Sequence, residues 1–167
     1  KTNALIALMC FHASRFSARE TDGNGPVLYE DQDKSLWDIQ LILQGMNFLT
    51  LSAKGDEVTS YHIEAQIACW HCREDEYPEK WDNILQLYNR LLLINYSPAV
   101  ALNRTFALYK TKGAFEALQE AKKLNLEGNH FYYLLMAELY KDIDRQKAGE
   151  NLEKALKTSK TEPEKEI

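Results

Sequence analysis

Three carboxylates capable of chemistry, at positions 30, 31 and 33, are gathered in the first half of the segment YEDQDKSLWD, residues 29–38. Glu30, Asp31 and Asp33 could bind a hard cation or work as an acid–base pair. A calcium-binding loop requires ligands at alternate positions, a central glycine and a distal glutamate, whereas here the glycines come before the acids. The segment also directly precedes a long apolar run, and carboxylates at the positive end of a helix dipole are stabilised by about 0.3–1 kcal/mol each. It therefore favours a helix start with a recognition surface over catalysis.

Two cysteines three residues apart, Cys69 and Cys72, form a second candidate site. Cys10 and His12 could complete a zinc site with them, but zinc motifs usually bring their ligand pairs from a turn. A single such pair on a helix is more often a pair of small core residues. We expect neither a metal nor a cofactor.

Motifs for nucleophilic or phosphate chemistry are missing from the sequence. It has no G-x-S-x-G elbow, no G-x-x-x-x-G-K-[ST] loop and no G-x-G-x-x-G loop. The lone histidines His62, His71 and His130 are more typical of a helical core or its edge. We therefore expect a protein that is not an enzyme.

Two arginines, Arg15 and Arg19, follow the first apolar run. They could be the solvated end of a helix. They could equally pair with Asp31 or Asp33 and fix that loop against the helix, since guanidinium groups bind carboxylates in a planar, two-pronged geometry. Both interpretations remain open at this point.

The composition limits the possible classes of protein. The chain has 167 residues, 45% of them hydrophobic and 27% charged, with a net charge of −5. Scattered basic residues oppose nucleic-acid binding, which needs clustered Lys and Arg. No apolar run approaches the roughly 18 residues of a membrane span. Three cysteines fit reduced thiols in the cytoplasm, and the start at Lys1 suggests the cut end of a longer protein.

Helical spacing of apolar residues dominates the chain, and about eight helices are expected. The first covers roughly 2–14, and a loop with TDGNGP at 21–26 follows. The next should begin near Ser35, because Ser35 and Asp38 have capping-box spacing. Its predicted apolar face consists of Leu36, Ile39, Leu43, Met46 and Leu49. Further helices are expected over about 60–73, from Trp81, and from Ser97-Pro98, a hydroxyl cap followed by proline.

An internal repeat marks the last third of the chain. Residues 106–124 align with 137–155, so that Leu108-Tyr109 matches Leu139-Tyr140 and Ala117 matches Ala148. Helix pairs with small residues at the crossing are the design of tetratricopeptide repeats, whose period is slightly longer. The predicted fold is all-α: an irregular helical bundle over 1–95, tetratricopeptide-like pairs over 96–160 packed on it as one domain, and a charged tail over 161–167 that frays.

Four segments together resemble one known family. They are ALIALMCFHASRFSAR (4–19), LYEDQDKSLWD (28–38), YHIEAQIACWHC (61–72) followed by Trp81-Asp82, and LYNRLLLINYSPAVALNR (87–104). In this order they resemble the C-terminal extension of a group of bacterial RNA polymerase sigma factors of the extracytoplasmic-function (ECF) class. In that group a tetratricopeptide-like domain follows the two sigma domains that bind DNA and polymerase.

The family pattern falls on particular residues of this sequence. Its A-R-x-x-A-R-like helix end matches 14–19, with Ser14 in place of alanine, and its Q-A-A-I-A-A-x-H element matches 64–71, with Glu64 and Gln66 as departures. The residues on which its four elements fall include Arg15, Arg19, Asp31, Gln32, Asp33, Trp37, His71, Asn103 and Arg104.

The resemblance implies a non-catalytic regulatory domain that supports transcription initiation in the bacterial cytoplasm. Its implied partners are the RNA polymerase core, the parent's own sigma domains, or a signalling protein, with no direct contact to nucleic acid or membrane. An alternative class is a small-molecule or metal sensor with a site between the Asp31–Trp37 loop and the Trp70–Cys72 helix. A hydrolase that depends on Asp31 or Asp33 is a weaker third.

Overall fold

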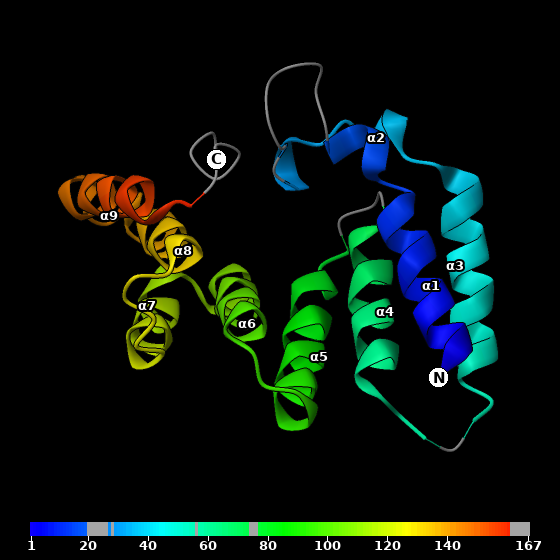
Figure 1. Ribbon diagram of the computed structural model, residues 1–167. Coiled ribbons are helices and arrows are strands. Elements are labelled where there is room, and N and C mark those ends of the chain that lie inside the picture. The colour runs from blue at the N-terminus through cyan, green and yellow to red at the C-terminus, as the bar shows by residue number, and fades with distance from the viewer. Residues whose placement is uncertain (20–26, 28, 56, 74–76, 161–167) are drawn as a thin grey trace. The chain divides into compact units, whose positions relative to one another are not determined.

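The computed structural model describes residues 1–19, 27, 29–55, 57–73 and 77–160, and every regular element in these ranges is helical (Figure 1). The predicted all-α class is confirmed. The elements are α1 (Thr2–Ala13), α2 (Phe16–Arg19), the 3₁₀ turns η1 (Tyr29–Asp31) and η2 (Lys34–Leu36), α3 (Ile39–Ser52), α4 (Ser60–His71), α5 (Lys80–Ile94), α6 (Pro98–Lys112), α7 (Ala114–Lys123), α8 (His130–Tyr140) and α9 (Arg145–Thr158). Among the described helices, none has the length and apolar character that crossing a membrane requires.

The chain divides into two compact units. The first contains the described residues of 1–80 together with Leu93–Asn95, and the second contains Trp81–Leu92 together with 96–160. Most of α5 thus belongs with the later helices, whereas the sequence placed the boundary after residue 95. That both parts form one domain stays a prediction. The loop expected at 21–26 and the tail expected at 161–167 lie outside the described residues.

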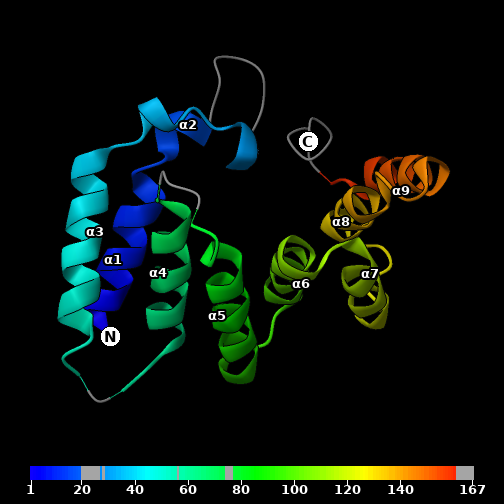
Figure 2. The ribbon, with the colours of Figure 1, turned by 180° about the vertical axis from the view of Figure 1, so that it is seen from behind.

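The first unit is a bundle in which α1 packs against both α3 and α4 (Figure 2). Small residues make the close approach possible: Ala4 and Ala7 of α1 and Ala65 of α4 are fully buried. Gly45 of α3 faces the ring of Phe11, and a Cβ at position 45 would lie 2.7 Å from Phe11 Cε1. Small side chains therefore let these helices pack closely around the ring of Phe11.

The start of α3 differs from the prediction. Ser35 lies in η2, where its backbone N–H donates to Asp33 Oδ1 over 2.9 Å. The helix begins at Ile39, and Asp38 is its cap, accepting from the backbone N–H of Leu41 over 3.0 Å. The chain between η2 and α3 is extended at Trp37, which is 4% exposed. Burial of this large ring decides the local conformation, so the capping box predicted at Ser35 is wrong.

The apolar face predicted for α3 is wrong for four of its five residues, because Leu36, Ile39, Leu43 and Met46 are exposed. The fifth, Leu49, is half-buried and packs against the core of the first unit, and the buried residues of the helix are Ile42, Gly45 and Ser52. The close contact with Phe11 needs a side without large side chains. The glycine side of the helix therefore turns inward.

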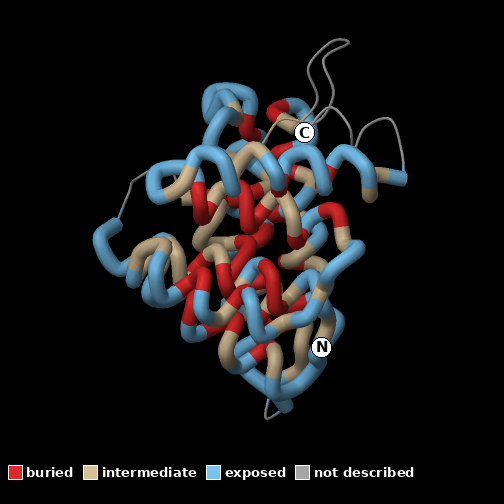
Figure 3. The backbone as a smooth tube through the Cα atoms, turned by 90° about the vertical axis from the view of Figure 1, so that its left-hand side faces the viewer, coloured by how far each residue is buried: buried red, intermediate tan, exposed pale blue. Residues whose placement is uncertain are grey.

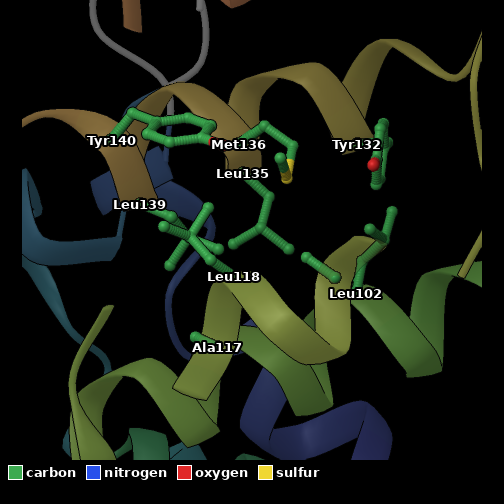
Figure 4. Close-up of a cluster of buried hydrophobic side chains, with 9 residues drawn as sticks. Leu102, Ala117, Leu118, Tyr132, Leu135, Met136, Leu139 and Tyr140 are labelled. Atoms are coloured by element: carbon green, nitrogen blue, oxygen red, sulfur yellow. The ribbon is translucent and has the colours of Figure 1, made fainter. Parts of the chain in front are cut away.

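The second unit consists of antiparallel helix pairs, α6 with α7 and α8 with α9, preceded by most of α5. Gly113, with φ of 89°, makes the tight turn between α6 and α7. The core of these pairs is drawn in Figure 4 and includes Leu102, Ala117, Leu118, Ala121, Tyr132, Leu135, Met136, Leu139 and Tyr140. Helices of both units carry buried stretches beside exposed ones (Figure 3), as amphipathic helices do.

Candidate functional site

Three of the four family-like segments meet around one buried cation in the first unit. Arg15 is only 6% exposed, although it lies directly after the end of α1. Its guanidinium carbon is 5.4 Å from the centroid of the Tyr29 ring and 6.0 Å from that of the Trp37 ring. Aromatic faces attract cations, and more strongly when water is excluded. We call Arg15, Tyr29, Trp37, His71 and Lys80 the arginine cluster.

Backbone contacts at the end of α1 hold the cluster together. Ser14 is buried, and its backbone carbonyl accepts from the N–H of Asp38 over 2.8 Å. Its hydroxyl donates to the Phe11 carbonyl over 2.9 Å and lies 3.7 Å from the sulfur of Cys72. These contacts join the loop before α3 and the end of α4 to the end of α1.

A second set of contacts runs through Tyr29. Its hydroxyl donates to the backbone carbonyl of His71 over 2.9 Å and accepts from Lys80 Nζ over 2.9 Å. The rings of Tyr29 and His71 meet edge to face, with centroids 4.8 Å apart. Tyr29 and Lys80 were missed by sequence reasoning, because nothing in the local pattern shows that residue 29 packs against the end of a helix near residue 71.

Burial and neighbouring basic groups disfavour a positive charge on His71. Burial, followed by the charges of Arg15, Lys80, His12 and Arg19, lowers the pKa of His71 to about 3. Burial and the neighbouring arginines also lower the pKa of His12. His71 is therefore neutral at physiological pH. Protonating it would add a positive charge beside those of Arg15, Lys80 and Arg19.

Arg15 and Arg19 were expected either to be solvated or to pair with Asp31 or Asp33, and the structure matches neither expectation completely. Within the described residues, no ion pair joins Arg15 or Arg19 to Asp31 or Asp33. Both aspartates are exposed, and Asp33 instead accepts from the backbone N–H of Ser35. Arg15 is not solvated either, because aromatic rings occupy the place where an acid was expected. Arg19 Nη2 lies 3.2 Å from His12 Nδ1.

The buried polar atoms without a hydrogen-bond partner among the described residues of the first unit include Arg15 Nε, Trp37 Nε1 and Gln32 Oε1. The Gln32 amide nitrogen donates weakly to the carbonyl of Val27, over 3.4 Å. Buried polar atoms in proteins are nearly always paired with protein, water or an ion. The lack of partners for these buried atoms is therefore unusual.

The cysteines do not converge into a metal centre in the described part of the chain. No three side chains of His, Cys, Asp or Glu come together there in a way that could hold an ion. Cys72 is buried, with its sulfur 3.6 Å from the carbonyl of Phe11. Burial raises the pKa of both the Cys69 and the Cys72 thiol, so neither is an activated thiolate.

The fourth segment places its residues in the second unit. Arg104 Nε donates to Asn89 Oδ1 over 2.9 Å, and Arg104 Nη1 lies 3.2 Å from Glu120 Oε2. Arg104 thus links α5, α6 and α7. Its neighbour Asn103 is exposed. Sequence reasoning identified Arg104 but neither of its partners.

Comparison with known proteins found two similarities to this sequence. Residues 1–53, which contain Arg15 and Trp37, match the model of a family of unknown function, DUF6596. An uncharacterized protein of Rhizobium meliloti (strain 1021) is 34% identical over 145 residues, which are 84% of this chain and 34% of the relative. The chain thus spans about a third of the length of that relative. No solved structure matches this chain.

Proposed function

We propose that this chain is a non-catalytic regulatory and protein-interaction domain from the C-terminal part of a bacterial ECF-type RNA polymerase sigma factor. The four-segment resemblance supports this role. Residues 1–53, which match a family of unknown function, contain the first two of these four segments. The greater length of the Rhizobium meliloti relative fits a domain that is one part of a longer protein.

One observation carries the proposal: residues of the family-like pattern contact one another. Ser14 accepts from Asp38, Arg15 lies against Trp37, and Arg104 binds Asn89. Residues that stabilise one another in this way build a scaffold. The pattern is then explained by a specific fold and the surface it presents, with no need for a reaction.

The surface next to this scaffold is formed by Asp31, Asp33 and Leu36, which are exposed while the adjacent Trp37 is buried. We call these three residues the motif surface. A leucine that is 51% exposed between charged residues suits a protein partner better than a nucleic acid. The proposed partners are the parent's own sigma domains, core RNA polymerase or a signalling protein in the bacterial cytoplasm.

The test is promoter-specific transcription in vitro with the full-length parent protein and core polymerase. Deleting the segment equivalent to this chain should change either the activity or its regulation. Leu36→Ser should reproduce part of this change without unfolding the domain. Leu152→Ser is the matched control, because Leu152 of α9 is 53% exposed and lies outside the family-like segments. Transcription and regulation that survive the deletion unchanged would remove the proposed role.

A further inference from the structure

Arg15 is a buried charged side chain with an unusual lack of polar partners. Its side chain is 94% buried, as 6% is exposed, yet within the described residues it has neither an ion pair nor a side-chain hydrogen bond. The aromatic faces of Tyr29 and Trp37 offset only part of the free-energy cost of burying the Arg15 charge. A buried charge is expensive unless it is paired and hydrogen-bonded, and removing one partner from such a pair is strongly destabilising. Arg15 is therefore a buried cation without an anionic partner among the described residues.

A second unpartnered donor lies beside it. Trp37 Nε1 is buried without an acceptor, and the guanidinium carbon of Arg15 lies 6.0 Å from the centroid of the same indole ring. A tryptophan N–H usually finds a partner when it is buried. Two neighbouring residues therefore have buried N–H donors without an acceptor.

The surrounding charges have the sign that such a ligand requires. The groups that act on His71 are all basic: Arg15, Lys80, His12 and Arg19. Asp31 and Asp33 belong to the neighbouring loop but are exposed and do not reach the arginines. A negative ion bound at Arg15 would therefore be attracted by several cations at once.

We propose that Arg15 and Trp37 form a binding site for a small oxyanion, a carboxylate or a phosphate group, whose oxygens accept from the guanidinium and from the indole N–H. Planar guanidinium groups bind both kinds of anion in a two-pronged geometry. The small exposed fraction of Arg15 restricts the ligand to a small ion or to the terminal group of a larger molecule. The proposal is independent of the sigma-factor role, because it rests on the unpaired donors alone.

Nuclear magnetic resonance of the whole chain tests the site directly. The protein has three tryptophans, Trp37, Trp70 and Trp81, and their indole N–H signals can be assigned with single Trp→Phe variants. Titration with inorganic phosphate or with acetate, at constant ionic strength set by chloride, should shift the Trp37 signal saturably and leave the other two in place.

The variants separate this site from a general attraction of anions to a basic surface. Arg15→Gln should weaken binding about tenfold or more, since it removes a charge-assisted hydrogen bond. Arg73→Gln is the matched control: Arg73 also lies over aromatic rings of the first unit, 4.1 Å from the Trp70 centroid, and its loss should leave the affinity unchanged. If Arg15→Gln fails to fold, Trp37→Phe keeps the ring and removes the N–H, and calorimetry should then show severalfold weaker binding.

Each result decides the question. Saturable binding of phosphate alone assigns the site to phosphate groups, binding of acetate alone assigns it to carboxylates, and binding of both supports a general oxyanion site. A Trp37 signal that chloride shifts equally, or that neither anion moves, would overturn the proposal. An affinity that is the same in the wild type and in both the Arg15 and Trp37 variants would overturn it as well.

Discussion

His71 should make the first unit sensitive to acid in a pH range where carboxylates contribute little. Its pKa in the folded protein is lowered to about 3, against 6.5 for an ordinary histidine. Between these values the unfolded chain binds a proton at His71 and the folded chain does not. The resulting stability is fully present above pH 6.5 and is lost as the pH falls towards 3.

The magnitude follows from proton linkage. For a single group, each unit by which the pH falls within this window lowers the free energy of unfolding by about 1.4 kcal/mol. Between pH 7 and pH 5, His71 alone should therefore lower the free energy of unfolding by about 2 kcal/mol. His12 acts in the same direction, because its pKa is also lowered. The carboxylates with lowered pKa, such as Asp33, have ordinary values near 3.8 and change their charge mainly below this range.

Urea denaturation at pH 7, 6 and 5 measures this loss. The experiment uses a Trp81→Phe background, so that tryptophan fluorescence reports the first unit through Trp37 and Trp70. His71→Phe keeps an aromatic edge against Tyr29 and removes the titration, so its stability should fall by about 2 kcal/mol less than that of the parent between pH 7 and pH 5. Equal pH dependence in the two proteins, with equal m-values, would refute the electrostatic account of the cluster.

Four further substitutions test the packing and the caps. Gly45→Ala should destabilise the protein by about 1–3 kcal/mol, because its Cβ would meet the ring of Phe11. Gly149→Ala, where nothing lies within 4 Å of the added Cβ, should instead stabilise α9 by about 1 kcal/mol; thermal unfolding distinguishes the two. Asp38→Ala should cost about 1 kcal/mol, as the loss of a helix cap does, whereas Ser35→Ala should change the unfolding free energy by about 0.5 kcal/mol or less. Equal losses at positions 38 and 35 would contradict the observed start of α3.

Local signals predicted the helices well where a cap and an apolar rhythm agree. Ser97 caps α6 as expected, with its hydroxyl accepting from the N–H of Val100 over 3.2 Å and with Pro98 as the first helical residue. The prediction failed at α3, where Ser35 and Asp38 have equally suitable side chains. Burial of Trp37 selected the later start, and burial is a property of the tertiary structure that no local spacing contains.

The sequence predicted some of the residues of the candidate site but not how they are arranged. Arg15, Trp37 and His71 were identified from the sequence, but their arrangement depends on the hydrogen bond between Asp38 and Ser14, which folds the loop back onto α1. The excess of acids in that loop suggested ion pairs. Sequence composition alone does not reveal which side chains of a loop turn inward, and here the aromatic ones do.

The proposed partner surface and the proposed anion site can be tested independently, because the acids of the loop are exposed and its aromatic rings turn inward. Asp31 and Leu36 are exposed, so changes at these positions alter what a partner protein meets and leave the arginine cluster in place. Arg15 and Trp37 are buried, so Trp37→Phe changes the donor set and leaves the exposed face intact. A variant of Leu36 that loses transcriptional activity but binds phosphate or acetate normally would support a partner surface that works without the ion. Loss of both functions in Trp37→Phe, with its fold intact, would instead indicate that the bound anion holds the loop in the conformation that the partner recognises.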